Sequence, residues 1–365
     1  MSPVFLPGLE LSRVLYEDAV RPILDDAFPH LSYAAARVGP GSEVLGFDTA
    51  RSADHDWGPR LELFLSPDDA DAYADDIRHV LAARLPAEVR GWPTHFVHSE
   101  DPADPVSFMR APDGATVDHR VTVHDVPAWT SARLGPMPSE AAPDTLTWLS
   151  LPQQHLAELT GGAVFHDGPG DLTALRERLA WYPDQVWRYL LAAQWQRLSQ
   201  EEAFVGRCAE VGDDLGSAVV AGRLVRDLMR LCLLLERRYA PYAKWLGSAF
   251  ARLEIAPALT PALRAALAAT DPADRERHLC DAYETVAAAY NALGLTAPLD
   301  PARRPYHSRP FLVLHAERFA HALAATLTDP VLRALPLTGS VDQWSDSTDL
   351  LGHPAAVRAA THALG

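Results

Sequence analysis

The sequence predicts an α+β protein with a mixed sheet in its N-terminal part and an all-helical C-terminal part. Up to about residue 168, short alternating or β-branched segments are interspersed with helical patterns, as in a mixed-sheet α+β domain. Beyond that point the long apolar segments have helical spacing, with glycine and proline between them. A chain of 365 residues is also long enough to bury two separate cores. We therefore expect two domains, residues 1–168 and 169–365, with a boundary near Gly168–Gly170.

The N-terminal part is predicted to begin with a helix, because apolar positions from Glu10 to Phe28 recur at helical spacing. A second helix is expected over residues 67–86, which open with proline and acidic residues and then become more apolar. The segments RLELFL and VDHRVTVHDV alternate apolar and polar side chains, which is typical of half-buried strands. Strands are predicted over residues 33–39, 60–65, 94–99 and 117–126. Between the first two, GPGSEVLGFD is expected to form a turn that opens a short helix.

The C-terminal part is predicted to contain a series of amphipathic helices. They are expected over residues 171–181, 184–204, 216–238, 261–269, 272–293 and 314–327. The segment EEAFVGRCAEVGDDLGS, residues 201–217, carries three glycines and several charged side chains. We expect it to be a loop between helices, and charged residues on such loops are candidates for a functional site.

Composition limits the classes of function. The net charge is -16, which argues against a long nucleic-acid partner and favours a small molecule or a protein. The sequence contains no run of about 18 apolar residues, so no membrane span is expected. Its beginning lacks the basic start and apolar run of a secretory signal. Three cysteines without metal-ligand spacing fit small, reduced core residues of a cytoplasmic protein.

One short segment offers both a phosphate-binding turn and a metal-binding pair. Gly41 allows the backbone to approach a phosphate closely, and Ser42 adds a hydroxyl and an N–H at an expected helix start, where anions are favoured. Asp54 and Asp56 are separated by one residue, so on an extended segment both carboxylates point the same way and His55 points away. Two adjacent carboxylates repel each other unless a divalent cation lies between them. Mg²⁺ prefers such carboxylates together with substrate phosphates.

These residues carry a resemblance to a known superfamily. A Gly-Ser pair, a spacer of roughly ten residues, and Asp-x-Asp before a strand resemble the signature of polymerase-β-type nucleotidyltransferases. GSEVLGFD and RSADHDWGPR more closely resemble the DUF4037 family, and so do GGAVFHDGPGDL, EEAFVGRCAEVGDDLGS, RLVRDLMRLCLLLERRYAPYAKWLGSAF and SRPFLVL. The resemblance implies an N-terminal nucleotidyltransferase domain with an appended helical domain, arranged as in antibiotic adenylyltransferases.

The resemblance also implies roles for single residues. Gly41 and Ser42 would contact the β- and γ-phosphates of a nucleoside triphosphate, and Asp54 and Asp56 would hold one or two Mg²⁺ ions, with Mn²⁺ able to substitute. Such enzymes usually carry a third carboxylate on a later strand. Here the aligned position holds Arg120, which departs from the pattern. Two neighbouring acids are alternatives for the missing carboxylate, Asp118 in preference to Asp125.

Further candidates lie outside this segment. Glu210, on the glycine-containing loop, is a candidate for acceptor binding or for a general base, or it serves only a structural role. Arg226 either binds phosphate or forms part of a solvated helix face. Lys244, the only lysine in the chain, lies between aromatic residues and is a candidate for binding the triphosphate or pyrophosphate. Trp57 and Arg60 are either part of the scaffold around the turn or residues that stack on and pair with the nucleotide.

The sequence therefore favours a metal-dependent nucleotidyltransferase that moves a nucleotide from a nucleoside triphosphate to a hydroxyl of a small molecule and releases pyrophosphate. The acceptor would be a metabolite, a sugar or an antibiotic. One alternative is a transferase that attaches AMP or UMP to a protein. Another is a module that binds a nucleotide without reacting, which the arginine at position 120 favours. The sequence leaves the base, the acceptor and the oligomeric state open.

Overall fold

The computed structural model describes residues 3–103, 105–114, 116–137 and 141–363. The chain forms two compact units. The first comprises Met1–Ala142 and His155–Ala180, and the second comprises Pro143–Gln154 and Trp181–Gly365. The sheet of the first unit contains parallel and antiparallel pairs, which confirms the α+β class.

The boundary expected near Gly168–Gly170 falls inside the first unit, because helix α7 (Asp171–Arg178) belongs to that unit. Asp167 holds the start of α7, since its carboxylate accepts hydrogen bonds from the backbone N–H groups of Gly170 and Thr173 at 2.9 and 2.8 Å. Near the other end, Arg176 donates to the carbonyl of Leu159 at 2.7 Å. Residues 143–154, in contrast, belong to the second unit.

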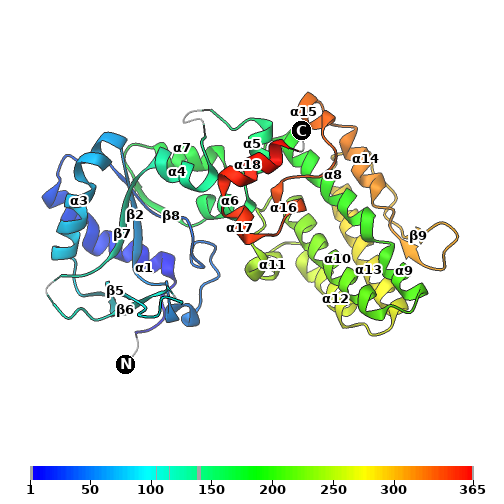
Figure 1. The fold of residues 1–365 in the computed structure, drawn as a ribbon, viewed down its shortest axis with the longest axis horizontal. Helices are drawn as coiled ribbons and strands as arrows, with labels where there is room; N and C mark the ends of the chain where they lie inside the picture. Colours follow the sequence, from blue (N-terminus) through cyan, green and yellow to red (C-terminus); the bar gives the residue numbers. More distant parts are fainter. Residues whose placement is uncertain (1–2, 104, 115, 138–140, 364–365) are drawn as a thin grey trace. The chain divides into compact units, whose positions relative to one another are not determined.

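The first unit is built on a four-stranded sheet in the order β7-β2-β1-β8 (Figure 1). Its strands are β1 (Ala34–Arg37), β2 (Arg60–Leu65), β7 (Arg120–Asp125) and β8 (Ala163–Asp167). Strand β1 runs antiparallel to β2 and β8, while β2 runs parallel to β7. The strands expected at 33–39, 60–65 and 117–126 therefore form this sheet, and β8 is an additional strand.

Two small antiparallel ribbons lie outside that sheet. The strand expected at 94–99 forms β5 (His95–His98), whose partner is β6 (Ser107–Arg110), a strand that was not predicted. The second ribbon pairs β3 (Glu88–Val89) with β4 (Trp92–Pro93). The first ribbon positions residues of the candidate site.

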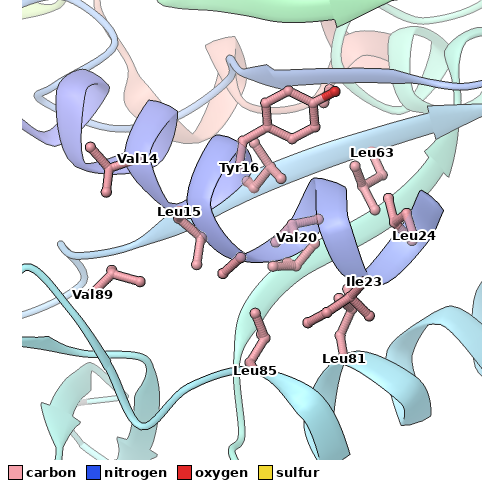
Figure 2. Packing of buried hydrophobic residues seen from close by; sticks show 14 of the residues in the cluster. Val14, Leu15, Tyr16, Val20, Ile23, Leu24, Leu63, Leu81, Leu85 and Val89 are labelled. Carbon is pink, nitrogen blue, oxygen red and sulfur yellow. The ribbon is translucent and has the colours of Figure 1, made fainter. Parts of the chain in front are cut away.

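The helix expected over Glu10–Phe28 forms as α1 (Gly8–Leu15), a π-helical turn (Tyr16–Val20) and α2 (Arg21–Ala27). The wider turn ends two residues before Pro22, whose missing N–H and bulky ring disturb regular α-helical bonding. One face of this helix packs against the sheet, and α3 (Pro67–Arg84) completes the core (Figure 2). The core side chains labelled there are Val14, Leu15, Tyr16, Val20, Ile23, Leu24, Leu63, Leu81, Leu85 and Val89.

The first unit also contains the short 3-10 helix η2 (Ala50–Asp54) and helix α4 (Val126–Leu134), which follows β7. Helix α6 (Gln153–Thr160) precedes β8, and its residues from His155 onward belong to this unit.

The second unit is mainly helical (Figure 1). Its helices are α5 (Thr145–Ser150), α8 (Asp184–Glu201), α9 (Phe204–Glu210), α10 (Asp214–Leu235), α11 (Ala243–Phe250), α12 (Ala256–Ala268), α13 (Pro272–Ala292), α14 (Glu317–Ala324), α15 (Pro330–Ala334), α16 (Val341–Trp344), α17 (Thr348–Leu351) and α18 (Pro354–His362). The expectation of an all-helical part needs one correction, because β9 (Arg304–Pro305) and β10 (Leu312–Val313) form a short antiparallel ribbon.

A second correction concerns residues 201–217, which were expected to form a loop. Most of the segment is helical, with α9 in its centre. Gly206 lies inside α9 because the ring of Phe311 packs against it. A Cβ atom at Gly206 would lie 2.4 Å from Cγ of Phe311. The glycine therefore permits close packing and does not break the helix.

Among the described residues, no helix is both long and apolar enough to cross a membrane. The three cysteines, all within the described ranges, form no disulfide.

Candidate functional site

The Gly41–Ser42 segment follows strand β1 and consists of successive turns. The N–H of Val44 bonds the carbonyl of Gly41 at 3.2 Å, and the N–H of Phe47 bonds the carbonyl of Ser42 at 2.8 Å. The short helix expected after Gly41 does not form, so the structure provides no helix N-terminus at this point. Gly41 itself has φ +154°, a backbone conformation that side chains rarely adopt.

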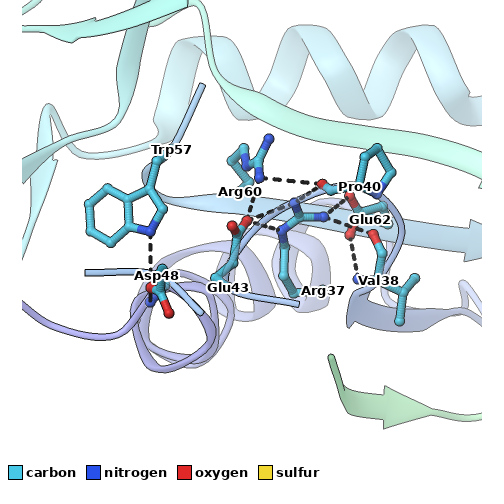
Figure 3. A network of polar contacts seen from close by, with 9 residues as sticks. Arg37, Val38, Pro40, Glu43, Asp48, Trp57, Arg60 and Glu62 are labelled. Atoms are coloured by element: carbon cyan, nitrogen blue, oxygen red, sulfur yellow. Dashed lines mark hydrogen bonds and ion pairs between the residues drawn. The ribbon is translucent and has the colours of Figure 1, made fainter. Parts of the chain in front are cut away.

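A buried network of charged side chains lies against this turn, and its hydrogen bonds are drawn in Figure 3. The guanidinium of Arg37 donates to Glu43 and to Glu62, each at 2.8 Å, and to the carbonyl of Pro40 at 2.6 Å. Arg60 donates to the same Glu43 carboxylate. The side chains of Arg37 and Glu43 are each only 2% exposed. Two cations thus face two anions directly under the Gly41–Ser42 turn.

The network balances its own charge. Burial alone would lower the pKa of Arg37, but the carboxylates of Glu62 and Glu43 outweigh it, and the pKa is raised. Burial would raise the pKa of Glu43, but Arg37 and Arg60 outweigh it, and the pKa is lowered. Both groups are therefore held in their charged forms. The hydrogen bonds of Arg37 and Arg60 hold Glu43 and the carbonyl of Pro40, both in the turn, although Nε of Arg60 is buried without a hydrogen-bond partner.

Arg60 and Trp57 were each open to a scaffold role or a nucleotide-binding role. The side chain of Arg60 is 19% exposed and is paired with Glu43. Trp57 is buried, and its Nε1–H donates to the carboxylate of Asp48 at 3.1 Å. Asp48 also accepts a hydrogen bond from the backbone of Gly8 at 2.7 Å. Both side chains therefore contribute to the scaffold that holds the turn.

Asp54 ends the 3-10 helix η2. This helix forms because the side chains of Thr49 and Ser52 cap each other's backbone at its start. The side chain of Asp54 is half-exposed, and its Oδ1 lies 2.9 Å from Nδ1 of His55. The expectation that His55 points away from the aspartates is therefore wrong. The two residues interact because the backbone leaves the helix at this position.

Asp56 is held in an unusual conformation. Its φ is +45°, in the left-handed region, and strand β2 begins four residues later. The N–H of Asp56 donates to the carbonyl of Ser107 at 2.8 Å, and the N–H of Ser107 donates to Oδ1 of Asp56 at 3.0 Å. The segment from Asp54 to Asp56 is therefore not uniformly extended, so strand alternation does not set the directions of the two carboxylates.

Ser107, at the start of β6, joins Asp56 to two further polar side chains. Arg120 of β7 donates to the Oγ of Ser107, and this Oγ lies 3.3 Å from Nδ1 of His98. The guanidinium of Arg120 also lies 5.6 Å from the centre of the Phe96 ring. Sequence analysis did not identify Ser107 or His98. The pairing of β5 with β6 brings them to Asp56, and no local sequence signal predicts that pairing.

The alternatives for a third carboxylate have other contacts. Asp118 is exposed and precedes β7; its backbone N–H donates to Nδ1 of His95 at 2.8 Å. Asp125 caps helix α4 by accepting from the N–H of Ala128 at 2.7 Å. Within the described ranges, no three or more histidines, cysteines or acids are grouped so that they could hold a metal ion. The structure therefore shows no cluster of three acids here.

The candidates in the second unit make contacts inside that unit. Glu210 ends α9 and is paired with Arg309 at 2.8 Å. Arg226 of α10 is paired with Asp346 at 2.7 Å. Lys244 is exposed on α11, with its Nζ 5.0 Å from the ring centre of Trp245. These contacts neutralise Glu210 and Arg226 with partners from distant parts of the chain.

Comparisons with known proteins give a family match for part of the chain. Residues 148–246 match a family described as "Domain of unknown function (DUF4037)". This match confirms the predicted resemblance over those residues. No curated protein matches the chain. A solved structure of a nucleotidyltransferase-like protein from Exiguobacterium sibiricum 255-15 shares 12% identity, with 87% of this chain and 91% of that chain covered and a TM-score of 0.33.

Proposed function

We propose that the chain is a metal-dependent nucleotidyltransferase that moves a nucleoside monophosphate from a nucleoside triphosphate to a hydroxyl of a small molecule. The observation that carries the proposal is the conformation of Asp56. A non-glycine residue at positive φ is strained by about 1 kcal/mol or more, and such strain concentrates at functional sites. Here the reciprocal hydrogen bonds with Ser107 maintain it and fix the carboxylate.

The two aspartates fit a cation that is shared with a phosphate. Oδ1 of Asp56 is bonded to Ser107, which leaves Oδ2 as the oxygen to meet a cation. The side chain of Asp54 is 49% exposed, and its ion-pair neighbours, His55 and Arg51, are themselves exposed. Mg²⁺ in proteins commonly takes one or two carboxylates, with phosphates and waters as its remaining ligands. A divalent cation held there would neutralise triphosphate charge and polarise the phosphoryl group.

The Gly41–Ser42 turn is the proposed contact for the β- and γ-phosphates. The proposed donors are the backbone N–H groups of Gly41 and Ser42 and the hydroxyl of Ser42. The buried ion network below would hold these donors in place before a ligand arrives. Such preorganisation is what in-line phosphoryl transfer requires, because its barrier is lowered mainly by positioning and by charge stabilisation.

The roles of the second unit are also part of the proposal. Lys244 and Arg226 would contact the triphosphate or the leaving pyrophosphate, and Glu210 would bind the acceptor or take its proton. Arg226 and Glu210 would exchange their present partners, Asp346 and Arg309, for these ligands. The net charge of -16 favours a cationic acceptor, such as an aminoglycoside-like antibiotic, over an anionic one.

Two isosteric variants test the proposal. Asp54→Asn and Asp56→Asn each remove a negative charge, while the amide introduced by Asp56→Asn would keep an oxygen to accept the Ser107 hydrogen bond. We expect each to reduce pyrophosphate release, measured with a panel of hydroxylated acceptors, by roughly a hundredfold or more. The melting temperature should change little. Asp75→Asn, on the exposed surface of α3, is the matched control and should retain activity.

Binding of a non-hydrolysable triphosphate, measured by calorimetry with and without Mn²⁺, completes the test. We expect affinity to depend on the cation in the wild type and to lose that dependence in both variants. Full transfer activity in either variant would contradict the proposal. Cation-dependent binding without pyrophosphate release for any acceptor would instead favour the nucleotide-binding module.

A further inference from the structure

We infer that Arg120 is a phosphate-binding residue of this same site and supplies, beside Asp56, positive charge that a second cation would otherwise provide. The inference rests on the proposed function and names a residue for which that function assigns no role.

The guanidinium of Arg120 is fixed by its surroundings. Arg120 is the first residue of β7 and is paired in parallel register with Arg60 of β2. Its Nη2 donates to the Oγ of Ser107, and its Cζ lies 5.6 Å from the centre of the Phe96 ring. A side chain restrained by a hydrogen bond and an aromatic ring loses little further freedom when it binds a ligand.

Ser107 places that guanidinium beside the Asp56 carboxylate. The backbone N–H of Ser107 donates to Oδ1 of Asp56 at 3.0 Å, while its side chain accepts from Arg120. Because the Ser107 Oγ accepts from Arg120, its own hydrogen is available to Nδ1 of His98 at 3.3 Å. One buried serine thus holds a proposed metal ligand and a cationic side chain together.

Arg120 differs from the other two arginines of this part of the sheet in its charge balance. Arg37 and Arg60 are paired with the buried carboxylates of Glu43 and Glu62. Arg120 makes no ion pair with any described residue, and it remains partly exposed. Only one of its N–H groups is used by Ser107, so the others can form the paired hydrogen bonds that guanidinium makes to phosphate.

The arrangement has a consequence for metal binding. The described residues provide no set of three metal-ligating side chains, so a cation at Asp54 and Asp56 would need phosphate oxygens as further ligands. A positive guanidinium beside Asp56 disfavours a bare divalent cation through like-charge repulsion, but it attracts a cation that arrives with a triphosphate. We therefore expect the metal to bind together with the nucleotide.

Arg120→Gln tests the inference, because glutamine keeps an N–H₂ group but removes the charge. Calorimetry with Mn²⁺ alone, and with Mn²⁺ plus a non-hydrolysable ATP analogue, gives two independent affinities. For Arg120→Gln we expect the affinity for the analogue to fall by roughly tenfold to a hundredfold. The affinity for Mn²⁺ alone should rise. A partly unfolded variant would lose both affinities. A rise in the affinity for Mn²⁺ alone together with a fall in the affinity for the analogue therefore shows an effect of the lost charge and not of a damaged fold.

Arg120→Lys keeps the charge and should retain more analogue affinity than Arg120→Gln. Unchanged analogue affinity in Arg120→Gln, or equal losses in the two variants, would overturn the inference. If the wild type binds no triphosphate at all, the proposed function fails as well. If Asp56→Asn abolishes cation-dependent binding while Arg120→Gln leaves it intact, only the role of Arg120 is disproved.

Discussion

Gly41 stands where three charged groups converge. A Cβ atom at this position would lie 2.6 Å from Nη2 of Arg37, 2.7 Å from Nη2 of Arg60 and 2.7 Å from Oε1 of Glu43. These groups belong to the buried network, so they cannot move aside without breaking hydrogen bonds to one another. The missing side chain is therefore a condition for the network.

Gly41→Ala should accordingly lower the free energy of unfolding by about 1–3 kcal/mol, through crowding and an unfavourable backbone conformation. Urea denaturation followed by circular dichroism measures the change. Gly212→Ala is the matched control, because Gly212 has φ +73° but nothing within 4 Å of the added Cβ atom. A loss no larger than that of the control would show that the network tolerates the side chain.

The local chemistry of the candidate site was predictable from single residues only in part. Gly41, Ser42, Asp54 and Asp56 stand close together in the sequence, so their spacing alone singled them out. Ser107 was not predicted because it lies 51 residues after Asp56 and is placed beside it by the pairing of β5 with β6. The left-handed backbone of Asp56 also depends on that contact, which is why the expectation of an extended segment was wrong.

Among the helices and strands, the connection from β10 to α14 depends on one buried acid. Glu202, just after α8, accepts from the N–H of Leu314 at 2.8 Å and from the N–H of Ala316 at 2.9 Å. Ala316 is the residue immediately before α14. Burial raises the pKa of Glu202 to about 7, although the two N–H groups act in the opposite direction.

This raised pKa predicts a specific pH dependence of stability. The pKa of Glu202 is about 7 in the fold against a reference value of 4.5, so between these values the folded state binds the additional proton. The contribution of Glu202 to the free energy of unfolding therefore falls as pH rises from 4.5 to 7, by up to about 3 kcal/mol. Glu202→Gln should remove this contribution.

Denaturation of the wild type and of Glu202→Gln at several pH values measures the contribution of Glu202 as the difference between their free energies of unfolding. Subtracting the variant cancels other titrating groups, such as Asp342, whose pKa burial raises to about 6. A difference between wild type and Glu202→Gln that does not change from pH 4.5 to 7 would contradict the prediction.

Elements with strong local signals were predicted well, and those defined by distant partners were not. Helix α3 begins at Pro67 with Ser66 as its cap, a signal contained in a few residues. Strand β8 was not predicted, because it is short and acquires its strand character by pairing with β1. In α9, Gly206 suggested a break, but the packing partner that explains it, Phe311, lies more than a hundred residues away.

For the molecule as a whole, the division into two units was expected, but the residues at which the chain passes from one unit to the other were not. Gly168–Gly170 marks a real turn between β8 and α7, and the composition changes there. Composition cannot show that α7 returns to the first unit, because that depends on capping by Asp167 and on contacts of Arg176 with preceding backbone.

This division predicts how fragments of the chain behave. A fragment ending at Gly168 lacks α7 and its buried leucines, such as Leu172 and Leu175, while a fragment ending at Ala180 keeps them. Each buried leucine contributes about 1.5–3 kcal/mol, so the shorter fragment should be several kcal/mol less stable. Urea denaturation of the two fragments tests this, and equal stabilities would show that α7 contributes nothing to the first unit.

The path of residues 143–154 also matters while the protein is being made. Trp148, Leu149 and Leu151 are buried, and helix α5, which carries the first two, packs against α18 near the end of the chain. On a ribosome these apolar side chains emerge roughly two hundred residues before α18 does. At ~5–20 residues per second α18 follows on the order of ten seconds or more later, so during that time α5 lacks the part of its cover that α18 supplies.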